Sequence, residues 1–175
     1  MSYNILGINP GHNGSACLVS DGELKYYLEE ERLSRMKYDG NPFKSMIDIM
    51  SKYHVDELVI VGTYPDHPIL PWTMEDVYTG LVRKYYPNVK TTLLGQDHHL
   101  THASCAFYNS GFKKAVAIIV DGAGTYKDIN MNEEGSVKAK GCETESVWTC
   151  EYPSKFNVLH KVFGDNTQNR MVNEK

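Results

Sequence analysis

Three strand-like segments at the start of the chain constrain its fold more than any other feature. Residues 3–9 are almost continuously apolar and end at the Pro10-Gly11 turn, as a buried strand does. Residues 15–19 are small and apolar, and residues 23–28 alternate in polarity after the tight Asp21-Gly22 turn. This order predicts an antiparallel meander of three strands.

Helical and strand-like segments alternate after the meander. Apolar residues recur at helical spacing in three segments, namely residues 42–53, 74–85 and 98–107. The apolar run at residues 58–61 indicates a buried strand, and residues 89–94 and 114–120 are two further predicted strands. The alternation predicts an α/β fold with a mixed sheet flanked by helices.

A weak internal repeat predicts two similar lobes. Residues 5–9 run into a glycine-rich turn at 10–14, and residues 116–120 run into a second glycine-rich turn at 121–124. Strand-like runs at 146–150 and 158–162 follow, before a polar end. We therefore expect a first lobe over residues 1–112 and the first strands of a second, incomplete lobe over residues 113–175.

Composition and charge argue against a nucleic-acid-binding protein and against a membrane-spanning one. A net charge of -4 and a pI near 6.0, with scattered lysines, give no general attraction to nucleic acid. The longest apolar run, residues 115–120, is far shorter than the roughly 20 residues of a membrane-spanning helix. The four cysteines lack CxxC spacing. We expect a cytoplasmic protein that binds neither membranes nor nucleic acid directly.

The residues with the clearest chemical meaning are His98 and His102. They are four positions apart, so they share one face of the predicted helix and can bind one metal ion. His99 stands where a metalloprotease needs glutamate, which disfavours peptidase activity. Asp121, at the end of a predicted strand, is the candidate third ligand, and this set suits iron, zinc or manganese. The alternative is that these histidines only cap and pack the helix.

Two glycine-rich turns follow predicted buried strands. Backbone N–H groups in such turns can approach phosphate oxygens because glycine has no Cβ. Together the turns predict a nucleotide cleft, with Gly11, Asn13, Gly14, Gly122 and Gly124 as the candidate binding residues. The alternative is that each turn only connects strands, because neither matches the phosphate-loop or dinucleotide fingerprint.

The charged run at residues 29–37 is expected to be a solvated segment. It follows a predicted strand whose neighbour leads into His12, so Arg35 and Lys37 are candidates for contact with an anionic ligand.

Four motifs in the same order resemble the O-carbamoyltransferases of nodulation-factor and antibiotic tailoring, which are related to the tRNA threonylcarbamoyl-transfer proteins. The motifs lie at residues 5–16, 29–35, 98–108 and 120–124 and so cover most of the chain. Asn13 departs from the aspartate common in that family.

The resemblance implies an actin-like ATPase fold, of the ribonuclease H-like type, with two lobes. It also implies that carbamoyl phosphate and ATP are joined as carbamoyl adenylate in a separate C-terminal domain, before the carbamoyl group moves to an acceptor hydroxyl. The matching iron ligands are His98, His102 and Asp121. His12 would act on the acceptor hydroxyl as a base or as a hydrogen-bond partner.

Relatives of this family continue with adenosine-binding segments, a further acidic ligand and the adenylate-forming domain. We therefore expect a chain that is incomplete as an enzyme and that pairs with a second polypeptide or with a copy of itself. The alternatives are a non-catalytic remnant that binds a metal or a partner, and an actin-like sugar kinase or threonylcarbamoyl transferase. The charged run at 29–35 argues against these last two enzymes.

Overall fold

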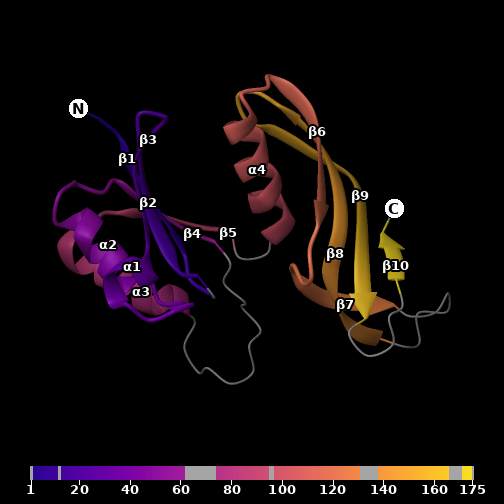
Figure 1. The fold of residues 1–175 in the computed structure, drawn as a ribbon, viewed down its shortest axis with the longest axis horizontal. Helices are drawn as coiled ribbons and strands as arrows, with labels where there is room; N and C mark the ends of the chain where they lie inside the picture. Colours follow the sequence, from indigo (N-terminus) through magenta and orange to yellow (C-terminus); the bar gives the residue numbers. More distant parts are fainter. Residues whose placement is uncertain are drawn as a thin grey trace. The chain divides into compact units, whose positions relative to one another are not determined.

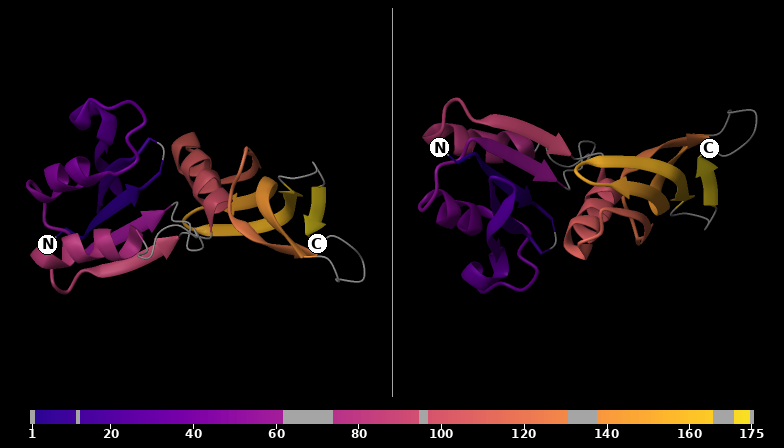
Figure 2. Two further views of the ribbon diagram at one scale, coloured as in Figure 1. Left: turned by 90° about the horizontal axis from the view of Figure 1, so that it is seen from below. Right: turned by 90° about the horizontal axis from the view of Figure 1, so that it is seen from above.

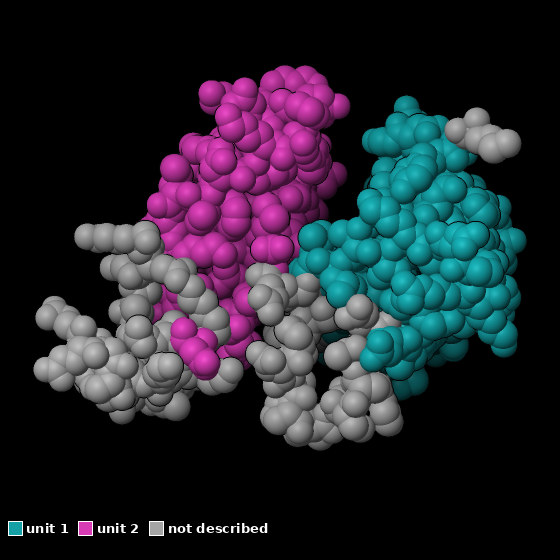
Figure 3. Space-filling view, turned by 180° about the vertical axis from the view of Figure 1, so that it is seen from behind, with its two compact units in different colours: residues 1–95 teal, residues 96–175 magenta. Residues whose placement is uncertain are grey.

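The computed structural model describes residues 2–11, 13–61, 74–94, 97–130, 138–165 and 171–174. The chain divides into two compact units, Met1–Gly95 (unit 1) and Gln96–Lys175 (unit 2), which are coloured separately in Figure 3. Residues 96–112, assigned to the first lobe on sequence grounds, belong to unit 2. No helix in the described ranges is both long and apolar enough to cross a lipid bilayer.

Unit 1 contains a mixed sheet of five strands (Figure 1). Its strands are β1 (Asn4–Asn9), β2 (Ser15–Ser20), β3 (Glu23–Glu29), β4 (Glu57–Val61) and β5 (Lys90–Leu94). The order is β3-β2-β1-β4-β5, with an antiparallel meander from β1 to β3 and parallel pairing of β4 with both β1 and β5. The predicted α/β class with a mixed, helix-flanked sheet is confirmed.

The core of unit 1 lies between one face of this sheet and two helices, α2 (Phe43–Met50) and α3 (Met74–Tyr85). The register aligns Leu6 with Leu18 and with Leu58, and all three side chains are fully buried. Helical crossovers allow neighbouring strands to run in parallel. The apolar strands and the helical periodicity in the sequence therefore specify one shared core.

The charged run after β3 forms the short helix α1 (Glu30–Ser34), and one of its residues is buried. Glu30 is only 2% exposed, and its carboxylate accepts the Lys44 N–H (3.0 Å), the Ser45 N–H (2.8 Å) and the Ser45 hydroxyl (2.8 Å). It therefore satisfies N–H groups in the first turn of α2. The expectation of a wholly solvated segment is wrong for Glu30, because its partners lie about fifteen positions away.

Unit 2 is built on an antiparallel sheet and one helix. Its elements are α4 (His98–Ser110), β6 (Lys114–Val120), β7 (Tyr126–Asn130), β8 (Lys138–Glu151), β9 (Lys155–Asp165) and β10 (Met171–Glu174). The order is β10-β9-β8-β6, and β7 also pairs with β8. Helix α4 lies along one face, where Ala103 and Phe107 join Trp148 in the core (Figures 1 and 2).

The other face of β6 carries apolar side chains that are exposed. Val116, Ile118 and Val120 are 61%, 71% and 75% exposed. Ala115, Ala117 and Ile119, which alternate with them, belong to the core beneath α4. In the part of unit 2 that the structure describes, β6 is also the edge of the sheet. The strand therefore presents both an apolar row and an edge to its surroundings.

Strands β6 and β7 both pair with β8, at successive positions along its length. Strand β6 pairs with the C-terminal part of β8 and β7 with its N-terminal part. The loop of residues 121–125 separates them, at the level of Glu143 and Thr144. The Asp121 N–H donates to the Thr144 carbonyl (2.9 Å), and the Gly124 N–H donates to the Glu143 carbonyl (2.7 Å). The loop is therefore fixed to β8 by its backbone.

Candidate metal centre

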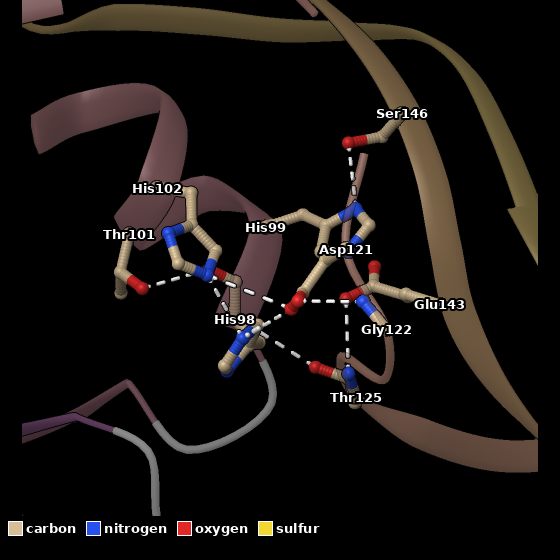
Figure 4. A network of polar contacts seen from close by, with 9 residues as sticks. All are labelled: His98, His99, Thr101, His102, Asp121, Gly122, Thr125, Glu143 and Ser146. Carbon is tan, nitrogen blue, oxygen red and sulfur yellow. Dashed lines mark hydrogen bonds and ion pairs between the residues drawn. The ribbon is translucent and has the colours of Figure 1, made fainter. Parts of the chain in front are cut away.

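Two histidines of the first turns of α4 point their Nε2 atoms toward one another (Figure 4). His98 is the first residue of the helix, and His102 follows one turn later. Their Nε2 atoms are 3.0 Å apart, and both side chains are partly exposed. The predicted spacing of four therefore brings two imidazole nitrogens together at an accessible position.

Asp121 completes a triangle of ligand atoms. It directly follows β6, and its Oδ2 lies 2.9 Å from His98 Nε2 and 3.6 Å from His102 Nε2. An ion about 2.1 Å from each atom would hold neighbouring ligands about 3.0 Å apart in octahedral geometry and about 3.4 Å apart in tetrahedral geometry. The three separations fall around these values, so the side chains fit one metal ion without large movement.

The Asp121 carboxylate is held in its charged form. Burial raises its pKa, but the Gly122 N–H, which donates to Oδ1 (2.7 Å), and the neighbouring His98 outweigh burial and lower the pKa below its ordinary value. Because Gly122 binds Oδ1, Oδ2 remains directed at the histidines. An ionised carboxylate beside two imidazoles is a donor set for iron, zinc or manganese.

His99 lies between the two candidate ligands in sequence but points into the core of unit 2. It is fully buried, and its Nδ1 lies 2.8 Å from the Ser146 hydroxyl. Burial lowers the pKa of its imidazole and so favours the neutral form. Its Nε2 has no hydrogen-bond partner among the described residues. The packing alternative therefore applies to His99, whereas His98 and His102 face away from the core.

The second glycine turn packs tightly against this core. A Cβ on Gly124 would lie 2.8 Å from Glu143 Cβ and 2.9 Å from His99 Nε2, so only glycine fits there. The N–H groups of Gly122 and Gly124 donate to Asp121 and to the Glu143 carbonyl. In this structure the two groups thus hold the loop, and their predicted role with phosphate stays a prediction.

The first glycine turn is also closed by backbone contacts, within unit 1. The Gly11 N–H donates to the Gly40 carbonyl (2.9 Å), and the Gly14 N–H donates to the Asp39 carbonyl (2.8 Å). A Cβ on Gly14 would lie 2.8 Å from the Gly40 carbonyl carbon. The close approach of two backbones explains glycine at position 14 without a nucleotide.

The remaining predicted site residues belong to unit 1. Asn13 has a left-handed backbone (φ 63°) suited to the turn, and His12 lies outside the described residues. Lys37 is exposed, with its Nζ 3.8 Å from Glu31 Oε1, and Arg35 has a left-handed backbone (φ 62°) at the end of α1. The roles of these four residues stay predictions.

Sequence reasoning did not find three residues that lie around the candidate metal centre. Glu143 of β8 is buried and accepts the Thr125 N–H (3.2 Å), and the Thr125 hydroxyl accepts the His98 N–H (3.3 Å). Lys161 of β9 forms an ion pair with Glu143. Their importance depends on strand pairing that joins distant positions, so no local pattern marked them.

Several curated proteins are similar to the chain. An uncharacterized protein of Methanocaldococcus jannaschii is 32% identical over 69% of this chain, and nodulation protein NolNO of Sinorhizobium fredii is 28% identical over 66%. An uncharacterized protein of Synechocystis is 25% identical over 91%. The matches cover 22%, 20% and 31% of the lengths of these relatives. No family model matches the chain.

Proposed function

We propose that this chain supplies the metal-binding part of an O-carbamoyltransferase. The reaction would move a carbamoyl group from carbamoyl adenylate, made from carbamoyl phosphate and ATP, to the hydroxyl of a small-molecule acceptor. The observation that carries the proposal is the triangle of His98 Nε2, His102 Nε2 and Asp121 Oδ2. The similarity to a nodulation protein and the four ordered motifs support the same class of reaction.

The donor set fits an ion with open positions. Two imidazole nitrogens and one carboxylate oxygen supply three ligands, which leaves room for substrate oxygens. When bound, Fe(II), or Zn or Mn, would supply electrostatic stabilisation of the oxygens that gain charge in the transition state. The chain's own contribution is to hold the three ligand atoms on one side of α4, next to the end of β6 (Figure 4).

In the transfer step the acceptor hydroxyl oxygen attacks the carbamoyl carbon. A new carbon–oxygen bond forms, the bond from that carbon to the phosphate oxygen breaks, and AMP leaves. The acceptor loses its hydroxyl proton, and His12 is the residue we propose to receive it or to hold the hydroxyl in place.

We also propose that a polypeptide from outside these 175 residues completes unit 2. The exposed row of Val116, Ile118 and Val120 on an edge strand supports this part of the proposal. Open edges and apolar faces are places where strands and helices of another segment pack. A metal- or partner-binding protein without catalysis is the second candidate function, and the same exposed row favours it.

The proposal is tested with radiolabelled carbamoyl phosphate, ATP and a panel of hydroxyl acceptors. The iron-loaded chain is assayed alone and with the polypeptides encoded beside it. We expect AMP and a carbamoylated product with the wild-type chain, and neither with His102→Ala. Product at the same rate with His102→Ala would overturn the role of the metal centre. Absence of AMP in every mixture that retains bound iron would favour the non-catalytic binding protein.

A further inference from the structure

Glu143 occupies a special position in β8, at the level of the loop that carries Asp121. Its side chain is only 1% exposed, although an ionised carboxylate is rarely buried without partners. The pairing of β8 with β9 shifts by one residue between Glu143 and Glu145. The carboxylate therefore lies under the loop at an irregular point of the sheet.

Three contacts of Glu143 hold this loop. Its carbonyl accepts the Gly124 N–H (2.7 Å), its own N–H donates to the Thr125 carbonyl (3.0 Å), and its carboxylate accepts the Thr125 N–H (3.2 Å). Thr125 in turn accepts the His98 N–H through its hydroxyl (3.3 Å). One residue thus connects the loop after Asp121 to the start of the helix that carries both histidines.

Lys161 makes the burial of this carboxylate possible. Its Nζ forms an ion pair with Glu143 Oε1, and its side chain is largely buried over the Trp148 ring, 5.2 Å from the centroid. Burial raises the pKa of Glu143, but the hydrogen bond and charge of Lys161 outweigh burial and lower the pKa below its ordinary value. The carboxylate thus remains an ionised acceptor for the loop.

We propose that Glu143 and Lys161 are positioning residues for the metal centre, which set the distance between Asp121 and the two histidines. The proposal rests on the metal site of the proposed function. Neither residue touches a ligand atom in the structure, so each would act through the loop of residues 121–125 and through the first turn of α4. Partners outside the ligand shell typically change metal affinity by about 10- to 100-fold.

The test compares the wild-type chain with Glu143→Gln and with Glu143→Gln/Lys161→Met. Glutamine keeps an acceptor for the Thr125 N–H, and the double variant leaves no buried charge unpaired. The control is Glu57→Gln, which alters a buried glutamate of unit 1 that binds Tyr3, Thr92 and Lys90. Zn(II) affinity is measured by competition with a chromophoric chelator, and the Co(II) absorption spectrum reports ligand geometry.

We expect the double variant to bind Zn(II) about tenfold more weakly than wild type and to change the Co(II) spectrum. Glu57→Gln should leave the Zn(II) affinity and the Co(II) spectrum unchanged, even if the thermal stability of this variant falls. Zn(II) affinity and a Co(II) spectrum equal to wild type in a folded double variant would overturn the positioning role. A wild-type chain that binds neither metal would instead overturn the metal site of the proposed function, which is a different result.

Discussion

The first strands of units 1 and 2, each followed by a glycine-rich turn, are alike in sequence but differ in their place in the sheet. In unit 1, β1 pairs with β2 on one side and with β4 on the other, and its Leu6 and Ile8 are buried. Among the described strands of unit 2, β6 lies at the edge of the sheet, and its Ile118 is exposed. The same strand-and-turn pattern therefore forms a central strand in unit 1. In unit 2 it forms a strand whose inward face, with Ile119, is buried and whose outward face, with Ile118, is exposed.

The turns that follow these strands differ in the same way. The turn after β1 is joined to Asp39 and Gly40 by backbone hydrogen bonds and carries no metal ligand among its described residues. The turn after β6 holds Asp121 next to His98. A glycine-rich turn is thus not a binding site by itself, and its chemistry depends on which side chains the fold brings to it.

The strongest test of this contrast compares two isoleucines. Ile8→Ala, in the core of unit 1, should lower the free energy of unfolding by about 2–5 kcal/mol, because it leaves a cavity. Ile118→Ala should cost less than about 1 kcal/mol, because the side chain is already in water. Hydrogen exchange of the β1 and β6 amides would measure each unit separately. Equal losses would show that a covered face was mistaken for an open one.

Glu30 tests whether a buried carboxylate in unit 1 has a purely structural role. Glu30→Ala removes the acceptor of two N–H groups in the first turn of α2 and should cost about 1–3 kcal/mol. Glu29→Ala, at a more exposed neighbour whose side chain binds Arg32, should stay within about 0.5 kcal/mol. Urea unfolding gives both values, and metal affinity should not change in either variant. A loss of metal affinity in Glu30→Ala would contradict the separation of roles.

The two glycine turns give a smaller contrast. Gly14→Ala places a Cβ 2.8 Å from the Gly40 carbonyl carbon and should destabilise unit 1 by about 1–3 kcal/mol. Gly122→Ala meets no atom within 4 Å, so stability should change by no more than about 0.5 kcal/mol. Thermal unfolding of the metal-free chain would distinguish them. A large loss at Gly122 would mean that its loop is packed more tightly than the structure shows.

The smallest expected effect is on the pH dependence of the stability of unit 1. The hydrogen bond from Thr92, together with Lys90 and Tyr3, outweighs burial and lowers the pKa of Glu57. A lowered pKa stabilises the fold above the ordinary carboxyl pKa, and this stabilisation is lost as the pH falls through the lowered value. Glu57→Gln should therefore show a smaller decrease in unit 1 stability between pH 7 and pH 3, measured by urea unfolding. An unchanged pH dependence would contradict the stabilising role of this carboxylate.

Local patterns in the sequence predicted most of the strands and helices. The apolar run of β1, the Asp21-Gly22 turn and the periodicity of α3 act over a few residues, and each segment was found as expected. Strands β7 and β10 were not expected, because these short segments form strands by pairing with β8 and β9, which local sequence patterns do not reveal. The actin-like assignment stays a prediction, since it concerns a larger arrangement than either unit.

The residues of the candidate site also fall into two groups, those that a local sequence pattern predicts and those that only strand pairing brings together. The spacing of His98 and His102 follows from one turn of helix, and the position of Asp121 follows from the end of a strand. Glu143 and Lys161 could not be found by such reasoning, because 18 positions separate them and only the register of β8 and β9 unites them. Both side chains are largely buried.

The central claim is that His98, His102 and Asp121 bind one metal ion, and elemental analysis of anaerobically purified protein tests it most directly. We predict one equivalent of metal, with iron as the expected element, in the wild-type chain and in His160→Ala, which alters an exposed histidine of β9. We predict loss of that metal in His98→Ala, His102→Ala and Asp121→Ala. Absence of metal from the wild-type chain after anaerobic loading, or its retention in all three variants, would contradict the claim.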